Sequence, residues 1–258
     1  VIGATTSNSG EWQILWWFGI FLTLTMWVWV IRRSDQDSTF FLTPATGVRE
    51  SNKVATWQRN AQIFSAMLFA LWSCQLFGFM TWLPQFLVSV HELTLGNAII
   101  GYSLPLVTIG IFNFAAAPIL RLGISVAVLL TVALSGQAIV WFLVFVTDGF
   151  HGLTLLAVYG MFCGLTPTCL YALPTTILGA NKTGPRAFGI LMTGRHLGVL
   201  LGPLLLGASL QNAGGWEFAT IIFGVITVCA TLGAAAGIED LLGEVDRAFL
   251  AGTFAFLR

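Results

Sequence analysis

Seven long apolar stretches run through this 258-residue chain, and each is long enough to cross a lipid bilayer as a helix. The hydrocarbon core of a bilayer requires about 20 consecutive apolar residues from a helix. The runs are continuous, without the residue-by-residue alternation of outer-membrane β-barrel strands. We therefore predict an all-α, polytopic membrane protein with about seven transmembrane helices. The predicted spans are 12–31, 62–90, 97–119, 124–146, 153–179, 187–210 and 217–237.

The composition excludes the other broad classes of protein. Hydrophobic residues make up 57% of the chain and charged residues only 9%. A soluble domain has about 45–50% apolar and about 25% charged residues, so this charge content cannot cover a water-exposed surface of comparable size. Binding to nucleic acid requires a basic face, and the formal net charge here is +0. We therefore exclude a soluble enzyme, a disordered chain and a nucleic-acid-binding protein.

The basic residues between the spans predict the orientation. Lys and Arg occur in every second connection and are absent from the others. Cytoplasmic connections of membrane proteins are enriched in Lys and Arg. The basic connections at 32–61, 120–123 and 180–186 are therefore expected in the cytoplasm, together with the C-terminal tail. We predict a multi-pass protein of the cell membrane, inner or plasma membrane, with its Val1 end outside.

The connection at 32–61 is long and polar, which is typical of a cytoplasmic linker between domains. The chain starts at Val1 rather than Met, so we interpret residues 1–31 as an outer segment plus a transmembrane helix of a preceding, missing half. Residues 62–237 would form a six-helix bundle, and 238–258 a cytoplasmic tail. The six spans divide into two three-helix blocks of opposite topology, the form of an inverted repeat.

Two sequence segments resemble the major facilitator superfamily of transporters. Residues 81–87 (TWLPQFL) are similar to the end of that family's seventh helix, and residues 198–203 (GVLLGP) to its eleventh. Polar residues concentrate in four of the six spans, as in that family's C-terminal half, where every third helix is peripheral. The resemblance implies that 62–237 is a C-terminal half and 12–31 the last helix of the N-terminal half. Gln75, upstream of the first segment, resembles the cyanate- and nitrate-type porters.

Arg195 is the strongest candidate for a solute-binding residue. It lies about eight residues into its span, about 12 Å from the cytoplasmic end. A charge at the centre of a membrane helix costs about 2.5–3.5 kcal/mol on insertion scales. The six spans contain no Asp or Glu except Glu217, at an interfacial end. Arg195 would bind an anionic solute or pair with an acid of the missing half; the alternative is snorkelling toward the cytoplasmic interface.

Four uncharged or titratable side chains are further candidates for solute contact. His196 follows Arg195 on a different face of the helix and could couple a proton to transport. The alternative is a neutral histidine bonded to its own helix. The other three side chains could form hydrogen bonds either to a solute or to a neighbouring helix. These are Gln75, Asn113 and Tyr171.

A second group of residues is predicted to serve helix packing and gating. Glycines every four residues form a seam for close helix approach, and prolines allow kinks that widen cavities. A degenerate copy of the family's cytoplasmic signature loop retains only the Arg-x-Gly at 121–123, which leaves the inner gate in question. The predicted residues are Gly194, Gly198, Gly202, Pro203, Pro84 and Arg121.

The chain lacks the motifs of several other functions. It has no P-loop for ATP and no nucleophile–base or metal-ligand cluster, so we predict no enzyme activity, cofactor or metal. The expected function is a secondary active transporter or facilitator for a small anionic or polar solute, working by alternating access. Its partners would be membrane lipid, the solute with a coupled proton, and the N-terminal half. The alternatives are a multidrug or sugar exporter of the same superfamily and a membrane scaffold that moves no solute.

Overall fold

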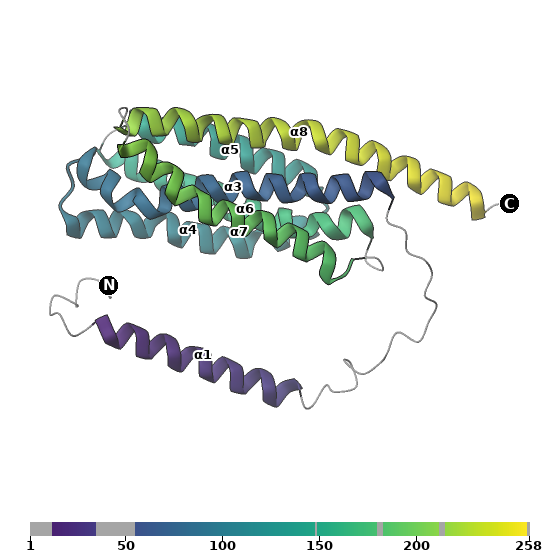
Figure 1. The fold of residues 1–258 in the computed structure, drawn as a ribbon, viewed down its shortest axis with the longest axis horizontal. Coiled ribbons are helices and arrows are strands. Elements are labelled where there is room, and N and C mark those ends of the chain that lie inside the picture. Colours follow the sequence, from purple (N-terminus) through teal and green to yellow (C-terminus); the bar gives the residue numbers. More distant parts are fainter. Residues whose placement is uncertain (1–11, 35–54, 148, 180–182, 212–214, 257–258) are drawn as a thin grey trace. The chain divides into compact units, whose positions relative to one another are not determined.

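The computed structural model describes residues 12–34, 55–147, 149–179, 183–211 and 215–256, and its regular structure there is entirely helical. The chain divides into two compact units, Val1–Lys53 and Val54–Arg258. The first unit contains α1 (Trp12–Ser34). The second contains α3 (Thr56–Ser89), α4 (Leu95–Arg121), α5 (Val126–Val146), α6 (Gly149–Leu178), α7 (Pro185–Gln211) and α8 (Gly215–Phe256) (Figure 1).

All six helices of the second unit are long and apolar enough to cross a membrane. This confirms the prediction of an all-helical, multi-pass membrane protein. Helix α1 coincides with the predicted span at 12–31, and its described apolar segment is the shorter Trp17–Trp29. Every described side chain from Trp17 to Trp29 is exposed within its own unit.

Two helices extend beyond their predicted spans. Helix α3 begins at Thr56 because the side chain of Gln58 stabilises its first turn. The Gln58 Oε1 accepts a hydrogen bond from the backbone N–H of Ala55 at 3.2 Å, and its Nε2 donates to the carbonyl of Ile177 at 3.1 Å. Helix α8 continues past Gly237 to Phe256, so the backbone of the predicted tail is helical through that residue.

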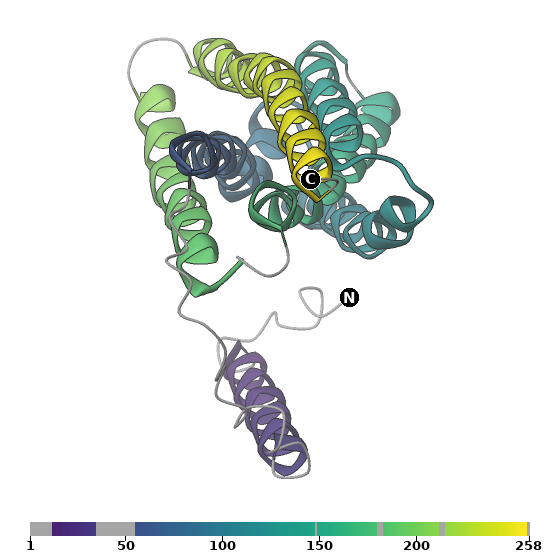
Figure 2. The same ribbon diagram turned by 90° about the vertical axis from the view of Figure 1, so that its right-hand side faces the viewer.

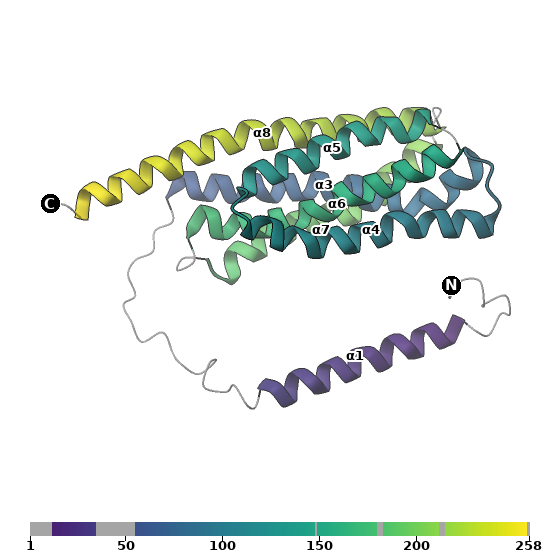
Figure 3. The same cartoon turned by 180° about the vertical axis from the view of Figure 1, so that it is seen from behind.

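Helices α3 and α6 lie in the middle of the bundle, with α7 against α3 on one flank, α4 against α6 on the other, and the α5–α8 pair covering a third side (Figures 1 and 3). The most extensive contacts join α3 to α7 and α4 to α6, whereas α6 and α7 contact each other only sparsely. The end-on view in Figure 2 shows the same arrangement along the bundle axis. Helix α3 therefore lies between α6 and α7 and contacts both of them.

The contact between α3 and α7 depends on the predicted glycine seam. Gly194, Gly198 and Gly202 are buried on one face of α7. Any side chain at these positions would overlap backbone of α3, because the two helices approach closely enough for their main chains to touch. The carbonyl oxygens in question belong to Ala66, Ala70 and Cys74. On the other side of the bundle, Gly160 and Gly164 of α6 approach the α4 backbone in the same way.

The two segments that resemble transporter motifs contact each other. The indole N–H of Trp82, in α3, donates a hydrogen bond to the carbonyl of Pro203, in α7, at 3.1 Å. Its ring lies against Gly207, where an added Cβ would be 2.8 Å from Cζ2 of the indole. Pro84 and Pro203 are both half-buried inside these helices. Trp82 therefore links the two proline-containing ends of α3 and α7.

Candidate functional site

Helix α7 places Arg195 at the middle of the membrane-spanning bundle. The residue is ten positions after Pro185, the first residue of α7, which corresponds to about 15 Å along the axis. That depth is about half of a hydrocarbon core of about 30 Å. The side chain is half-buried, and its guanidinium carbon lies 5.7 Å from the centre of the Phe77 ring on α3.

The charge of Arg195 has no carboxylate partner among the side chains that the structure describes. Between residues 55 and 237, the described acids are Glu92, in the turn after α3, and Glu217, in the first turn of α8. The contact with Phe77 supplies about 0.5–2 kcal/mol, less than the cost of about 2.5–3.5 kcal/mol for a charge at this depth. An anion bound at Arg195 would offset the difference.

Tyr171 lies close to Arg195 because α6 and α7 both pack on α3. Its hydroxyl donates to the sulfur of Met192 at 3.9 Å, and Met192 is one turn before Arg195 on α7. Its ring packs edge-on against Phe69, with the centroids 5.2 Å apart. Tyr171 therefore approaches α7 one turn from Arg195, while Phe69 and Phe77 are about two turns, about 12 Å, apart along α3.

Phe77 is a member of this site that sequence reasoning missed, and Ser73 is buried beside it in the α3–α7 contact. Ser73 is one turn before Phe77 and packs against Gly198 of the seam, which is itself one turn after Arg195. The Ser73 side chain is fully buried, and its Oγ has no hydrogen-bond partner. Serine and phenylalanine are common in membrane helices. Their four-residue spacing on one face of α3 becomes informative only once α7 is known to cover that face.

His196 and Asn113 are at the edges of the site. His196 is exposed, and its Nδ1 donates to the carbonyl of Met192 at 2.7 Å, one turn earlier on its own helix. Asn113 is half-buried on α4, and its backbone carbonyl accepts a hydrogen bond from Thr168 at 3.3 Å. Because Thr168 is one turn before Tyr171, Asn113 lies beside the same part of α6.

Gln75 lies on the other side of α3 from Arg195. Gln75 and Phe77 are two positions apart, so their side chains diverge by about 200° around the helix axis. Gln75 is fully buried and accepts hydrogen bonds from Gln137 of α5 and from the hydroxyl of Tyr159 of α6, the latter at 2.9 Å. The geometry is that of an interhelical bond, and the structure does not bring Gln75 together with Arg195.

Leucine at Gln75 should destabilise the bundle by about 1–3 kcal/mol, because it leaves the amide of Gln137 and the hydroxyl of Tyr159 buried without partners. The Nε2 of Gln75 and the Oε1 of Gln137 already lack hydrogen-bond partners. The double variant Gln75→Leu/Gln137→Leu should therefore recover part of the loss. Thermal unfolding in detergent measures the effect, with exposed Gln85→Leu on the same helix as the control. Additive losses in the double variant would contradict the network.

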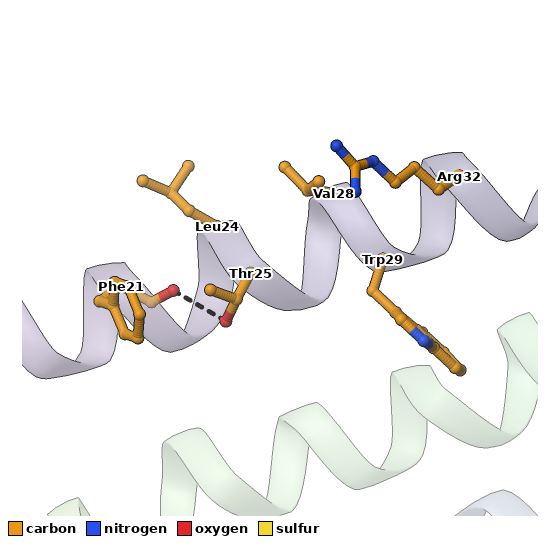
Figure 4. A pocket seen from close by; sticks show the side chains of 6 residues that line it. All are labelled: Phe21, Leu24, Thr25, Val28, Trp29 and Arg32. Atoms are coloured by element: carbon orange, nitrogen blue, oxygen red, sulfur yellow. Dashed lines mark hydrogen bonds between the residues drawn. The ribbon is translucent and has the colours of Figure 1, made fainter.

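Arg121 is at the end of its helix, and helix α1 belongs to the other unit of the chain. Arg121 is exposed as the last residue of α4. Along α1 runs a hollow of about 370 Å³ (Figure 4). Because all its lining residues belong to one helix, it is a groove on a helix surface rather than an enclosed cavity. The lining residues are Phe21, Leu24, Thr25, Val28, Trp29 and Arg32.

The described side chains contain no group of three or more His, Cys, Asp or Glu that could hold a metal ion. The contacts pair the cation of Arg195 with the Phe77 ring and place the Tyr171 hydroxyl beside Met192, one turn from Arg195. Such groups can bind and orient an anion. Comparison of the chain with family models, with curated proteins and with solved structures finds no match.

Proposed function

We propose that this chain belongs to a secondary transporter that moves a small anionic solute across a cell membrane by alternating access. The observation that carries the proposal is the position of Arg195, a cation midway through a membrane helix, over the Phe77 ring and without a carboxylate partner among the described side chains. Ionisable residues at this depth mark solute and ion pathways in membrane proteins.

The pattern of helix contacts supports a transporter of the inverted-repeat kind. A two-fold symmetry would exchange α3 with α6, α4 with α7 and α5 with α8. Under this exchange the α3–α7 contact corresponds to the α6–α4 contact. The exchange likewise converts α5–α6 into α8–α3, and α3–α4 into α6–α7. All of these pairs are in contact, as expected for two three-helix blocks related by a pseudo-two-fold axis. Such bundles rock against a second bundle around a central site.

The exposure of α4 and α7 supports a second bundle as partner, the N-terminal half of the same transporter. Only 11% of the most apolar window of α4 and 28% of that of α7 is buried, against 67% for α3. Helix α7 carries Arg195, and α4 packs against α6, which carries Tyr171. A second bundle against the exposed faces of α4 and α7, with lipid around the rest, would enclose the site between the two halves.

The test is transport by the full-length protein in proteoliposomes. We expect saturable uptake of a small organic or inorganic anion that depends on Arg195, and faster uptake under an inward proton gradient if a proton is coupled. The panel should include neutral sugars and cationic dyes, which an exporter of the same superfamily would favour. Protein that inserts and folds but moves none of these solutes would overturn the proposal in favour of a scaffold.

A further inference from the structure

The neighbours of Arg195 narrow the class of anion, and we infer that the solute is a monoanionic carboxylate with an aromatic or branched apolar body. The carboxylate would bind Arg195, and the body would lie against Phe77, Met192 and Tyr171. This inference rests on the proposed function and adds the substrate class to it.

The charge of the site favours a monoanion. The other Arg and Lys side chains described between 55 and 237 are close to helix ends: Arg59 in the first turn of α3, Arg121 at the end of α4 and Arg186 at the start of α7. Arg195 is therefore the single arginine or lysine described at mid-membrane depth. A dianion would leave one negative charge uncompensated there, which is as costly as the unpaired arginine itself.

The hydrogen-bond donors of the site match a carboxylate. A guanidinium can bind both oxygens of a carboxylate in parallel, in a bidentate pair. The Tyr171 hydroxyl bonds only to a thioether sulfur, which is a weak acceptor, so it can exchange that bond for one to a solute oxygen.

The walls of the site favour an apolar body. Phe77 lies under the guanidinium, while Tyr171 packs on the buried ring of Phe69 and reaches Met192. An inorganic oxyanion such as nitrate would lose its hydration against these rings and gain no compensating donors from them. An aromatic or branched body would instead bury apolar surface against them, which is favourable. Small-molecule sites commonly combine such walls with a few fixed polar groups.

The test measures stabilisation of the full-length protein in detergent by four small molecules. The probes are benzoate, acetate, nitrate and the uncharged isostere benzamide. We expect benzoate to raise the unfolding temperature at a half-saturating concentration at least tenfold below that of acetate or nitrate, with no effect of benzamide. Phe77→Ala should raise the half-saturating benzoate concentration at least tenfold, and Phe77→Leu, which keeps more of the volume, by less. Phe218→Ala, an exposed phenylalanine on α8, is the matched control.

The outcomes separate this inference from the proposed function. Equal or better stabilisation by nitrate or acetate, abolished by Arg195→Ala, would overturn the apolar body and leave anion transport standing. Stabilisation by benzamide equal to that by benzoate would overturn the role of the charge in both proposals. Absence of any response to benzoate would overturn the substrate class, while the proteoliposome panel tests transport independently.

Discussion

Leucine at Gly198 should prevent the six-helix bundle from reaching its folded state. The added side chain would overlap the carbonyl of Ala70 and the backbone N–H of Cys74, and neither can move without displacing α3. Overpacking a core with side-chain atoms costs about 1–3 kcal/mol, and a clash with backbone lies at or above that range. We expect little or no monodisperse protein after detergent extraction, measured by size-exclusion chromatography of a fluorescent fusion.

A control on the same helix separates packing from residue type. Gly189 is exposed, and an added Cβ there has no atom within 4 Å. Gly189→Leu should therefore leave yield and unfolding temperature close to those of the unmodified protein. If Gly198→Leu behaved like Gly189→Leu, the close approach of α3 and α7 would be wrong.

Alanine at Arg195 should reduce anion transport by a factor of 100 or more without loss of membrane insertion. Removing one partner of a buried charge pair costs about 3–5 kcal/mol, which is a factor of about 10² to 4 × 10³ in affinity. The unloaded protein should not lose stability, because the variant removes a charge that has no described carboxylate partner. The paired measurements are uptake into proteoliposomes and the unfolding temperature in detergent.

Arg186→Ala is the matched control, since Arg186 is an exposed arginine in the first turn of the same helix. It should alter uptake at most slightly. Unchanged transport kinetics in Arg195→Ala would remove Arg195 from the site. A large drop in its unfolding temperature would point instead to a structural ion pair with a carboxylate outside the described side chains.

The helices could be predicted from the sequence because each apolar run is long and bounded by polar residues. The glycine seam could also be predicted, because a glycine at every fourth position of a membrane helix mainly serves close packing against another helix. Helix ends were less predictable. Residues 56–61 are mostly polar, and α3 begins there because Gln58 reaches Ile177, a contact between residues 119 positions apart.

The site could be predicted only in part, because composition does not reveal which side of a helix faces which neighbour. Arg195 stands out in any membrane helix, whatever surrounds it. Gln75 is as polar as Asn113, yet the fold buries it on the opposite side of α3 from Phe77. Phe77 is unremarkable in sequence and acquires a role only from its distance to Arg195 across the α3–α7 contact.

Helix α8 runs without interruption well beyond its membrane-spanning part, so a small tilt of that part would move the far end of the helix by a larger distance. From Gly215 to Phe256 the helix is 42 residues, about 63 Å, whereas its membrane-spanning part ends at Gly237. A change of about 10° in the tilt of the spanning part would move the Phe256 end by about 11 Å if the helix turns about its Gly215 end. Rocking of the bundle, small at the Arg195 site, would therefore be largest at the far end of α8, where a single attached spectroscopic label would follow it.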